Sequence, residues 1–298
     1  MKRPMFERLF SYLLSAGLSG AILVLGLSLL FIQPQFDTAD AEADEWPAPF
    51  ELDEDALIAR AAVVYDLIGN QILYAKNADE SLPLASLTKL IAAHAVLMYE
   101  DPAREVVMSP TAIEPEGDWG FWVGEAWPLS DLISISLVAS SNDAITAAAE
   151  TLGTERISVI NNEARKLGLQ NMRILNPSGL DESLTTAGGY GSAQDMALLA
   201  GVFLKQHPTF FEATAAPFIT IQHGGRMLTA TSTATPLLSI PGLIGAKTGY
   251  TDLAGGNLVA AFDLELGRPL IVAVLGSTRE GRFEDVKTLL EAARRKTP

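Results

Sequence analysis

The sequence predicts a mixed α/β (α+β) domain whose antiparallel sheet is formed by N-terminal and C-terminal strands, and three observations carry this prediction. Residues 61–76 contain two short strand-like runs around Gly69-Asn70, a pairing typical of a hairpin. Between residues 86 and 206, apolar residues recur mainly at helical spacing. The last quarter returns to strand-like runs and one closing helix. We therefore expect one sheet with a helical subdomain inserted between its two halves.

An uncharged run, LFSYLLSAGLSGAILVLGLSLLFI, occupies residues 9–32 after Lys2, Arg3 and Arg8. Its length suits a transmembrane helix, and the flanking charges place residues 1–8 in the cytoplasm and the rest outside. A signal peptide cleaved near Ala39-x-Ala41 is the alternative, although the run exceeds the usual apolar core of about 7–15 residues. We expect a single-pass protein of the cell membrane with an extracytoplasmic domain, or a secreted protein if the segment is cleaved.

Residues 33–55 form the next expected unit, an acidic linker. It contains nine Asp or Glu residues, three prolines and no Lys or Arg. Such a segment lacks apolar periodicity, and its repelling charges keep it extended. Residues 56–298 then form a single exported domain.

The helical subdomain and the closing strands can be placed from their patterns. Helices are expected in SLTKLIAAHAVLMYE, on both sides of a break in SDLISISLVASSNDAITAAAETLG, in RISVINNEARKLGL and in SAQDMALLAGVFLKQ. Strands are expected in LIGAKTGYT, GNLVAAFDLELG and PLIVAVLG, and a final helix in RFEDVKTLLEAARR.

Composition excludes several kinds of function. The formal net charge of the 298 residues is −15, which disfavours nucleic acid as a partner because phosphate binding needs clusters of Lys and Arg. The absence of cysteine removes disulfides and thiolate metal ligands. Three widely spaced histidines form no ligand pattern, so we expect no metal site.

The first chemical motif is Ser86-x-x-Lys89, at the start of an apolar helix. Residues three apart share a helix face, so the amine can reach the hydroxyl. Burial favours the neutral form of lysine, which can accept the proton of a nucleophilic serine. The alternative is a helix-capping serine with a solvated lysine, because this motif alone is common.

The second and third motifs are Ser140-Ser-Asn142, in the break between two helices, and Lys247-Thr-Gly249 on an apolar strand. The hydroxyl and amide of the former suit proton relay and amide binding, although a simple helix cap has the same composition. Lys247 and Thr248 suit a carboxylate ligand. An edge-strand lysine that discourages aggregation is the alternative.

Together the motifs stand in the order S-x-x-K, S-x-N, K-T-G, a set shared by class A β-lactamases and penicillin-binding proteins. From about residue 61 to 295 the chain resembles the D-alanyl-D-alanine carboxypeptidases, the low-molecular-mass penicillin-binding proteins, which have a β-lactamase-like fold. The matching stretches are ASLTKL, GEAWPLSDLISISLVASSNDA, ILNPSGLD, SAQDMALLA, GAKTGYTDLAGGNLVAA and LGSTREGRFEDVKTLL.

The resemblance implies roles for individual residues. Ser86 is the implied acylated nucleophile, Lys89 its general base and Ser140 a proton relay, while Asn142 binds the peptide amide. For the rest of the substrate, Lys247 and Thr248 hold the terminal carboxylate, Gly249 lets the substrate lie close, and the N–H groups of Ser86 and Tyr250 form the oxyanion hole.

The implied reaction is removal of the terminal D-alanine from peptidoglycan stem peptides through an acyl-enzyme on Ser86, without a cofactor. Penicillins and other β-lactams are expected to acylate the same serine. Thr233-Ala234-Thr235 and Ser178 depart from the usual Asn-Thr-Asn and histidine of the family, which affects substrate detail more than the reaction.

Three other functions compete. A β-lactamase needs a glutamate for deacylation, and no E-x-x-L-N signature occurs between Asn142 and Lys247. A D,D-endopeptidase that cleaves peptidoglycan cross-links stays open as the main alternative. An inactive cell-wall or penicillin-binding protein is disfavoured by the complete motif set.

Several residues are weaker candidates. The aromatic residues Trp119, Phe121 and Trp122 can form either a cleft rim or a local core. Arg282 suits either the cleft or a helix-surface ion pair. His94, inside an apolar helix, is expected to be a packed core histidine.

Overall fold

The computed structural model describes residues 49–117, 120–264 and 267–295. The expected membrane segment at residues 9–32 and most of the expected linker lie outside these ranges. Within the described ranges, no helix combines the length and apolar character that crossing a bilayer requires. Phe50, in the last part of the expected linker, is buried and stacks on Tyr74, with ring centroids 5.5 Å apart.

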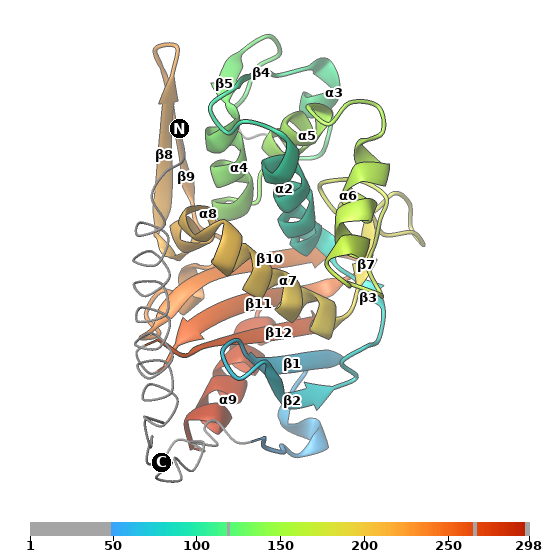
Figure 1. Ribbon diagram of the computed structural model, residues 1–298, viewed down its shortest axis with the longest axis vertical. Coiled ribbons are helices and arrows are strands. Elements are labelled where there is room, and N and C mark those ends of the chain that lie inside the picture. The colour runs from blue at the N-terminus through green and yellow to red at the C-terminus, as the bar shows by residue number, and fades with distance from the viewer. Residues whose placement is uncertain (1–48, 118–119, 265–266, 296–298) are drawn as a thin grey trace, which may run out of the picture. The chain divides into compact units, whose positions relative to one another are not determined.

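A five-stranded antiparallel sheet lies at the centre of the domain (Figure 1). Its order is β10 (Leu243–Thr251), β11 (Gly255–Asp263), β12 (Pro269–Ser277), β1 (Ala61–Asp66) and β2 (Gln71–Lys76). β1, the first strand in the chain, pairs with β12, the last strand in the chain, with Ala61 opposite Leu275 and Asp66 opposite Leu270. The expected pairing of N-terminal and C-terminal strands is thus confirmed.

Both faces of this sheet are buried, because successive side chains of a strand point to opposite faces. Val63, Val259 and Ala273 belong to the core shared with the helical subdomain, whereas Val64 and Val272 belong to a second core. Helix α7 (Ala193–Gln206) crosses the first face and α9 (Gly281–Arg295) covers the second (Figure 1). The nearly continuous apolar composition of these strands follows from this double covering.

The helical subdomain is inserted between β2 and β10, as expected. The reading of helix, break and helix is confirmed by α4 and α5, and Gly168, with φ +75°, follows the end of α6. Its helices are α2 (Thr88–Tyr99), α3 (Pro110–Ile113), α4 (Leu129–Val138), α5 (Asn142–Glu150), α6 (Arg156–Lys166), α7, and α8 (Pro208–Glu212), with short 3-10 turns at η2 (Ala85–Leu87), η3 (Ala213–Ala215) and η4 (Thr235–Leu237). A further 3-10 turn, η1 (Glu54–Ala56), precedes β1.

Small sheets complete the fold. They pair β3 (Leu82–Pro83), β7 (Gly189–Gly191) and β6 (Arg173–Ile174); β4 (Glu105–Val107) with β5 (Ala126–Pro128); and β8 (Phe218–His223) with β9 (Arg226–Thr231). The β8–β9 hairpin was not among the expected elements. Its signal was present, since two alternating runs flank Gly224-Gly225, a pair that suits a two-residue hairpin turn.

Candidate active site

Ser86 lies in the 3-10 turn η2, between β3 and the start of α2, rather than inside the α-helix itself. The preceding residue, Ala85, has φ +49°, a conformation that non-glycine residues adopt at a cost. Gly179 packs against this turn so closely that a Cβ there would lie 1.9 Å from Ala85 O. The surrounding structure therefore holds the strained turn that presents the serine hydroxyl.

Lys89 is fully buried, with its Nζ 2.8 Å from Ser86 Oγ. The same nitrogen donates to Asn142 Oδ1 at 2.8 Å and to the carbonyl oxygen of Ser178 at 2.7 Å. Burial, and secondarily the nearby charge of Lys247, hold the pKa of Lys89 well below its usual value.

These contacts define what the neutral amine can do. A neutral lysine has two N–H groups and one lone pair, and the two carbonyl oxygens of Asn142 and Ser178 occupy both N–H groups. In the protonated form the third N–H donates to Ser86 Oγ, and once the amine is neutral its lone pair takes that direction and can accept the serine proton. The solvated-lysine alternative is excluded, and the geometry is that of a serine with its general base.

Ser140 and Asn142 are brought to the same place by the break between α4 and α5. Ser140 has φ +65°, and its Oγ accepts a hydrogen bond from Lys247 Nζ at 2.8 Å. The capping role belongs to its neighbour, because Ser141 Oγ accepts from the N–H of Ala144 at 3.1 Å. Ser140 is thus left available for chemistry, and the helix-cap reading applies only to Ser141.

Lys247 lies on β10 and is also fully buried, which excludes the role of a solvated edge lysine. Burial, and secondarily the charge of Arg282, lower the pKa of Lys247 to about 7. Thr248 Oγ1 donates to Thr233 Oγ1 at 2.7 Å. Lys247 and Thr248 form a cation and hydroxyl pair suited to a carboxylate.

Gly249 brings β10 against the nucleophile. A Cβ at this position would lie 2.8 Å from Leu84 O and 3.1 Å from the backbone nitrogen of Ser86. Only glycine permits this approach. The backbone nitrogens of Ser86 and Tyr250, the expected oxyanion donors, therefore belong to adjoining backbone segments.

Arg282 was expected either near the cleft or in an ion pair on the surface of the last helix. It is 7% exposed and donates from Nη1 to Gly249 O at 2.7 Å, so a helix-surface ion pair is wrong and the cleft location is right. Burial, with the charge of Arg279 second, lowers the pKa of Arg282 to about 10. The guanidinium ties α9 to β10 beside the lysine.

Sequence reasoning missed contacts made by backbone carbonyls. Ser178 O holds Lys89, and Glu116 O accepts from Asn142 Nδ2 at 2.6 Å. Any residue type supplies a carbonyl oxygen, so neither contact has a signal in the sequence. Thr233 was noted only as a departure from a family pattern.

Of the weaker candidates from the sequence, some side chains lie in the core and one lies at the surface. Phe121 is buried edge-on against Trp127, whereas Trp122 is 64% exposed, and Trp119 lies outside the described residues. His94 is buried as expected, and its Nδ1 lies 3.1 Å from His207 Nε2.

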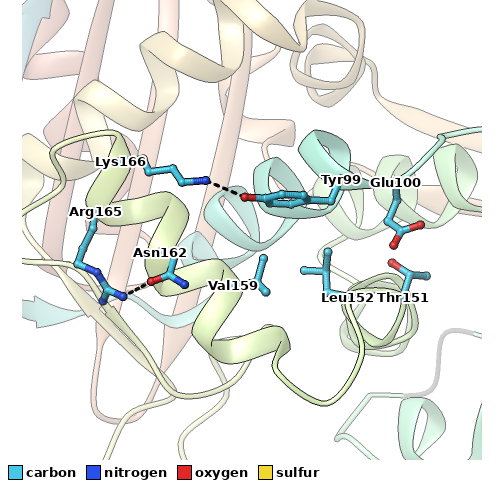
Figure 2. Close-up of a pocket in the computed structure, with 8 residues that line it drawn as sticks. All are labelled: Tyr99, Glu100, Thr151, Leu152, Val159, Asn162, Arg165 and Lys166. Carbon is cyan, nitrogen blue, oxygen red and sulfur yellow. Dashed lines mark hydrogen bonds between the residues drawn. The ribbon is translucent and has the colours of Figure 1, made fainter.

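A separate hollow of about 620 Å³ lies among the ends of α2 and α5 and the side of α6 (Figure 2). Tyr99 and Lys166 face each other across it, with Lys166 Nζ donating to the tyrosine oxygen at 2.8 Å. None of its eight lining residues belongs to the three motifs, so this hollow is distinct from the candidate active site.

Comparisons with known proteins show the family to which the sequence is similar and the fold that it shares. Residues 48–279 match the family model described as D-alanyl-D-alanine carboxypeptidase. The chain is 31% identical over 245 residues to D-alanyl-D-alanine carboxypeptidase DacF of Bacillus subtilis, covering 79% of this chain but only 62% of that protein. It is 28% identical to the D-alanyl-D-alanine endopeptidase of Pseudomonas aeruginosa, covering 79% and 77% of the two chains.

Among solved structures, Penicillin-Binding Protein D2 of Listeria monocytogenes in its ampicillin-bound form superposes with a TM-score of 0.72. The identity is 31%, over 81% of this chain and 100% of that one. The two chains therefore share a fold over the whole of the solved Listeria chain.

Proposed function

The chain belongs to the D-alanyl-D-alanine carboxypeptidase family, and we propose that it is a serine-type peptidase that removes the terminal D-alanine from peptidoglycan stem peptides. The observation that carries the proposal is the 2.8 Å contact between Lys89 Nζ and Ser86 Oγ at a fully buried position, where Asn142 Oδ1 and Ser178 O are the other two partners of the same nitrogen. A buried, neutral lysine in this position is a base for the serine.

In the acylation step, Ser86 Oγ attacks the carbonyl carbon of the penultimate D-alanine while its proton passes to Lys89 Nζ. The backbone N–H groups of Ser86 and Tyr250 stabilise the oxyanion. The amide C–N bond then breaks, and the leaving amine receives the proton that Lys89 accepted, passed on through Ser140. Lys247 Nζ, which donates to Ser140 Oγ at 2.8 Å, orients this hydroxyl. D-alanine leaves, and an ester remains on Ser86.

The deacylation step mirrors the first. Water takes the position of the leaving amine and attacks the ester carbonyl while its proton passes to Lys89 and Ser140. The ester C–O bond breaks, Ser86 Oγ recovers a proton, and the shortened peptide departs with a new carboxylate. No cofactor takes part in either step.

Specificity for a terminal carboxylate is assigned to β10. Protonated Lys247 and the hydroxyl of Thr248 bind the carboxylate of the last D-alanine, and Arg282 adds positive potential beside them. Asn142 is assigned to the peptide amide, and Gly249 keeps the strand close to the nucleophile.

Penicillins are proposed to acylate Ser86 because they present a carbonyl to the same nucleophile. The Listeria relative was solved with ampicillin and with cefotaxime. Without the E-x-x-L-N signature between Asn142 and Lys247, the acyl-enzyme is expected to hydrolyse slowly.

Residues 9–32 are proposed to anchor the domain on the outer side of the cell membrane, as their length and flanking charges suggest. The acidic segment after them would then serve as a tether. This places the active site in the compartment that contains peptidoglycan.

Cleavage of cross-links is the second candidate, favoured by the similarity to the Pseudomonas endopeptidase. The test uses the full-length chain in detergent with two substrates: diacyl-L-Lys-D-Ala-D-Ala and a purified cross-linked muropeptide dimer. Free D-alanine from the first substrate, abolished by Ser86→Ala, supports the carboxypeptidase. Monomer formation from the dimer without free D-alanine supports the endopeptidase, and activity on neither contradicts both.

A further inference from the structure

Trp122, between Glu116 and strand β5, presents an open aromatic face. Its side chain is 64% exposed, and the adjacent Val123 is 56% exposed. The Arg226 guanidinium carbon lies 4.0 Å from the centroid of the indole ring, so one face of the ring is stacked and the other faces outward. Trp122, Val123 and Arg226 are called the Trp122 platform below.

The platform is held by a set of local contacts. Glu125 closes the turn by accepting from the backbone nitrogen of Trp122 at 3.0 Å. Arg226, from β9, donates to the same carboxylate at 2.5 Å and to Gly120 O at 2.6 Å. An exposed tryptophan fixed in this way loses little side-chain entropy when a ligand binds.

The segment that carries Trp122 also contacts the catalytic residues. Glu116 O accepts from Asn142 Nδ2, and Asn142 Oδ1 in turn contacts Lys89. Trp122 is the sixth residue after Glu116, so the two lie at most about 20 Å apart. The chain therefore connects the platform to the candidate active site through Glu116.

A small hollow of about 170 Å³ adjoins the platform, lined by Glu125, Trp127, His223 and Arg226 among others. His223 Nε2 lies 2.8 Å from the 63%-exposed carboxylate of Glu105. An aromatic face beside carboxylate, guanidinium and imidazole groups suits a ring with one apolar face and several hydroxyls. The exposed acidic groups here disfavour an anionic lipid surface.

We propose that the Trp122 platform binds a sugar ring of the peptidoglycan glycan strand from which the stem peptide extends. The inference rests on the proposed function and adds a glycan subsite to it. Four extended residues between the scissile bond and the sugar of a pentapeptide stem span about 14 Å, and the further sugars of the same strand extend beyond that reach. The sugar stacks on the open indole face, and its hydroxyls reach Glu125 and Arg226.

The first test measures binding without turnover. The full-length Ser86→Ala protein in detergent is sedimented with increasing amounts of purified insoluble peptidoglycan. Adding Trp122→Ala raises the half-saturating concentration about fivefold or more, the usual minimum for an interface anchor. Trp122→Tyr retains binding because an aromatic face remains. Met98→Ala, a 51%-exposed position at the far end of α2, is the matched control and binds like the parent.

Binding by Ser86→Ala/Trp122→Ala within twofold of the Ser86→Ala parent overturns the inference. So does quenching of Trp122 fluorescence by brominated lipid when the protein is reconstituted in vesicles, because this result assigns the platform to the membrane. Neither readout requires catalysis, so a negative result in either can be distinguished from failure of the proposed peptidase activity.

The second test measures a ratio in the active protein. We divide kcat/KM for a disaccharide-linked pentapeptide by kcat/KM for the free pentapeptide. Trp122→Ala lowers this ratio at least about threefold, and Trp122→Tyr restores it. An unchanged ratio contradicts a glycan subsite, because a general loss of folded enzyme cancels in the quotient.

Discussion

Replacing Asn142 by aspartate tests whether Lys89 acts as a neutral base. Asn142 Oδ1 lies 2.8 Å from Lys89 Nζ, and both side chains are buried. A carboxylate at this distance favours the charged amine by about 6 kcal/mol at an effective dielectric constant of about 20. Since about 1.4 kcal/mol corresponds to a factor of ten, the neutral fraction of Lys89 falls by up to about four orders of magnitude.

The assay is the second-order rate of acylation by a fluorescent penicillin between pH 6 and pH 10. We expect Asn142→Asp to lose at least about 100-fold at pH 7 and to recover roughly tenfold per pH unit, because only the neutral amine accepts the serine proton. Asn142→Ala is the control: it removes the contacts with both Lys89 and Glu116 O and adds no charge. Acylation by Asn142→Asp within threefold of Asn142→Ala at every pH would refute the neutral-base mechanism.

Three further predictions concern Lys247, Gly249 and the buried histidines. Because the pKa of Lys247 is lowered to about 7, its cation is lost above that pH, and kcat/KM for a peptide with a free terminal carboxylate should fall there about tenfold per pH unit. Arg282→Ala should move this fall in kcat/KM to higher pH. A pH profile that stays flat to pH 9 would contradict the role of Lys247 in binding the carboxylate. Gly249→Ala should reduce penicillin acylation on the order of 100-fold, because its Cβ would lie 2.8 Å from Leu84 O and displace the strand by a fraction of an ångström or more; wild-type acylation in a folded variant would show that the close approach is unimportant. Burial lowers the pKa of His207 to about 4 and also lowers the pKa of His94, which faces Glu163 at 4.0 Å. Since these folded-state values lie below the unfolded value of 6.5, the stability they contribute is present above pH 6.5 and is lost as the pH falls toward 4. Urea denaturation should show a smaller loss over this window for His207→Phe than for the parent, and an equal loss would exclude the pair as the cause.

The central sheet and its inserted helices were predictable because their patterns are local. LIGAKTGYT coincides with β10, and the broken helical pattern coincides with α4 and α5. The β8–β9 hairpin was missed although its turn signal was present around Gly224-Gly225. Its alternation was overlooked between stronger helical and strand patterns.

The sequence predicted the part of the candidate site that is made by side chains, but not the part that is made by backbone groups. The three motifs predicted which residues meet, and the structure brings Ser86, Lys89 and Asn142 together as expected. The carbonyls of Ser178 and Glu116 could not be predicted, because chain folding rather than residue type places them. The buried position of Arg282 was likewise undecided, since it depends on how α9 packs against the sheet.

The central claim is that Ser86 forms an acyl-enzyme with Lys89 as its base. The most direct measurement is peptide mapping by mass spectrometry of the full-length protein after brief exposure to benzylpenicillin, with Lys89→Met alongside. We expect a single adduct on the peptide containing Ser86, and at least a thousandfold slower adduct formation in Lys89→Met, as removal of a catalytic base implies. An adduct on another residue, or an unchanged rate in Lys89→Met, would contradict it.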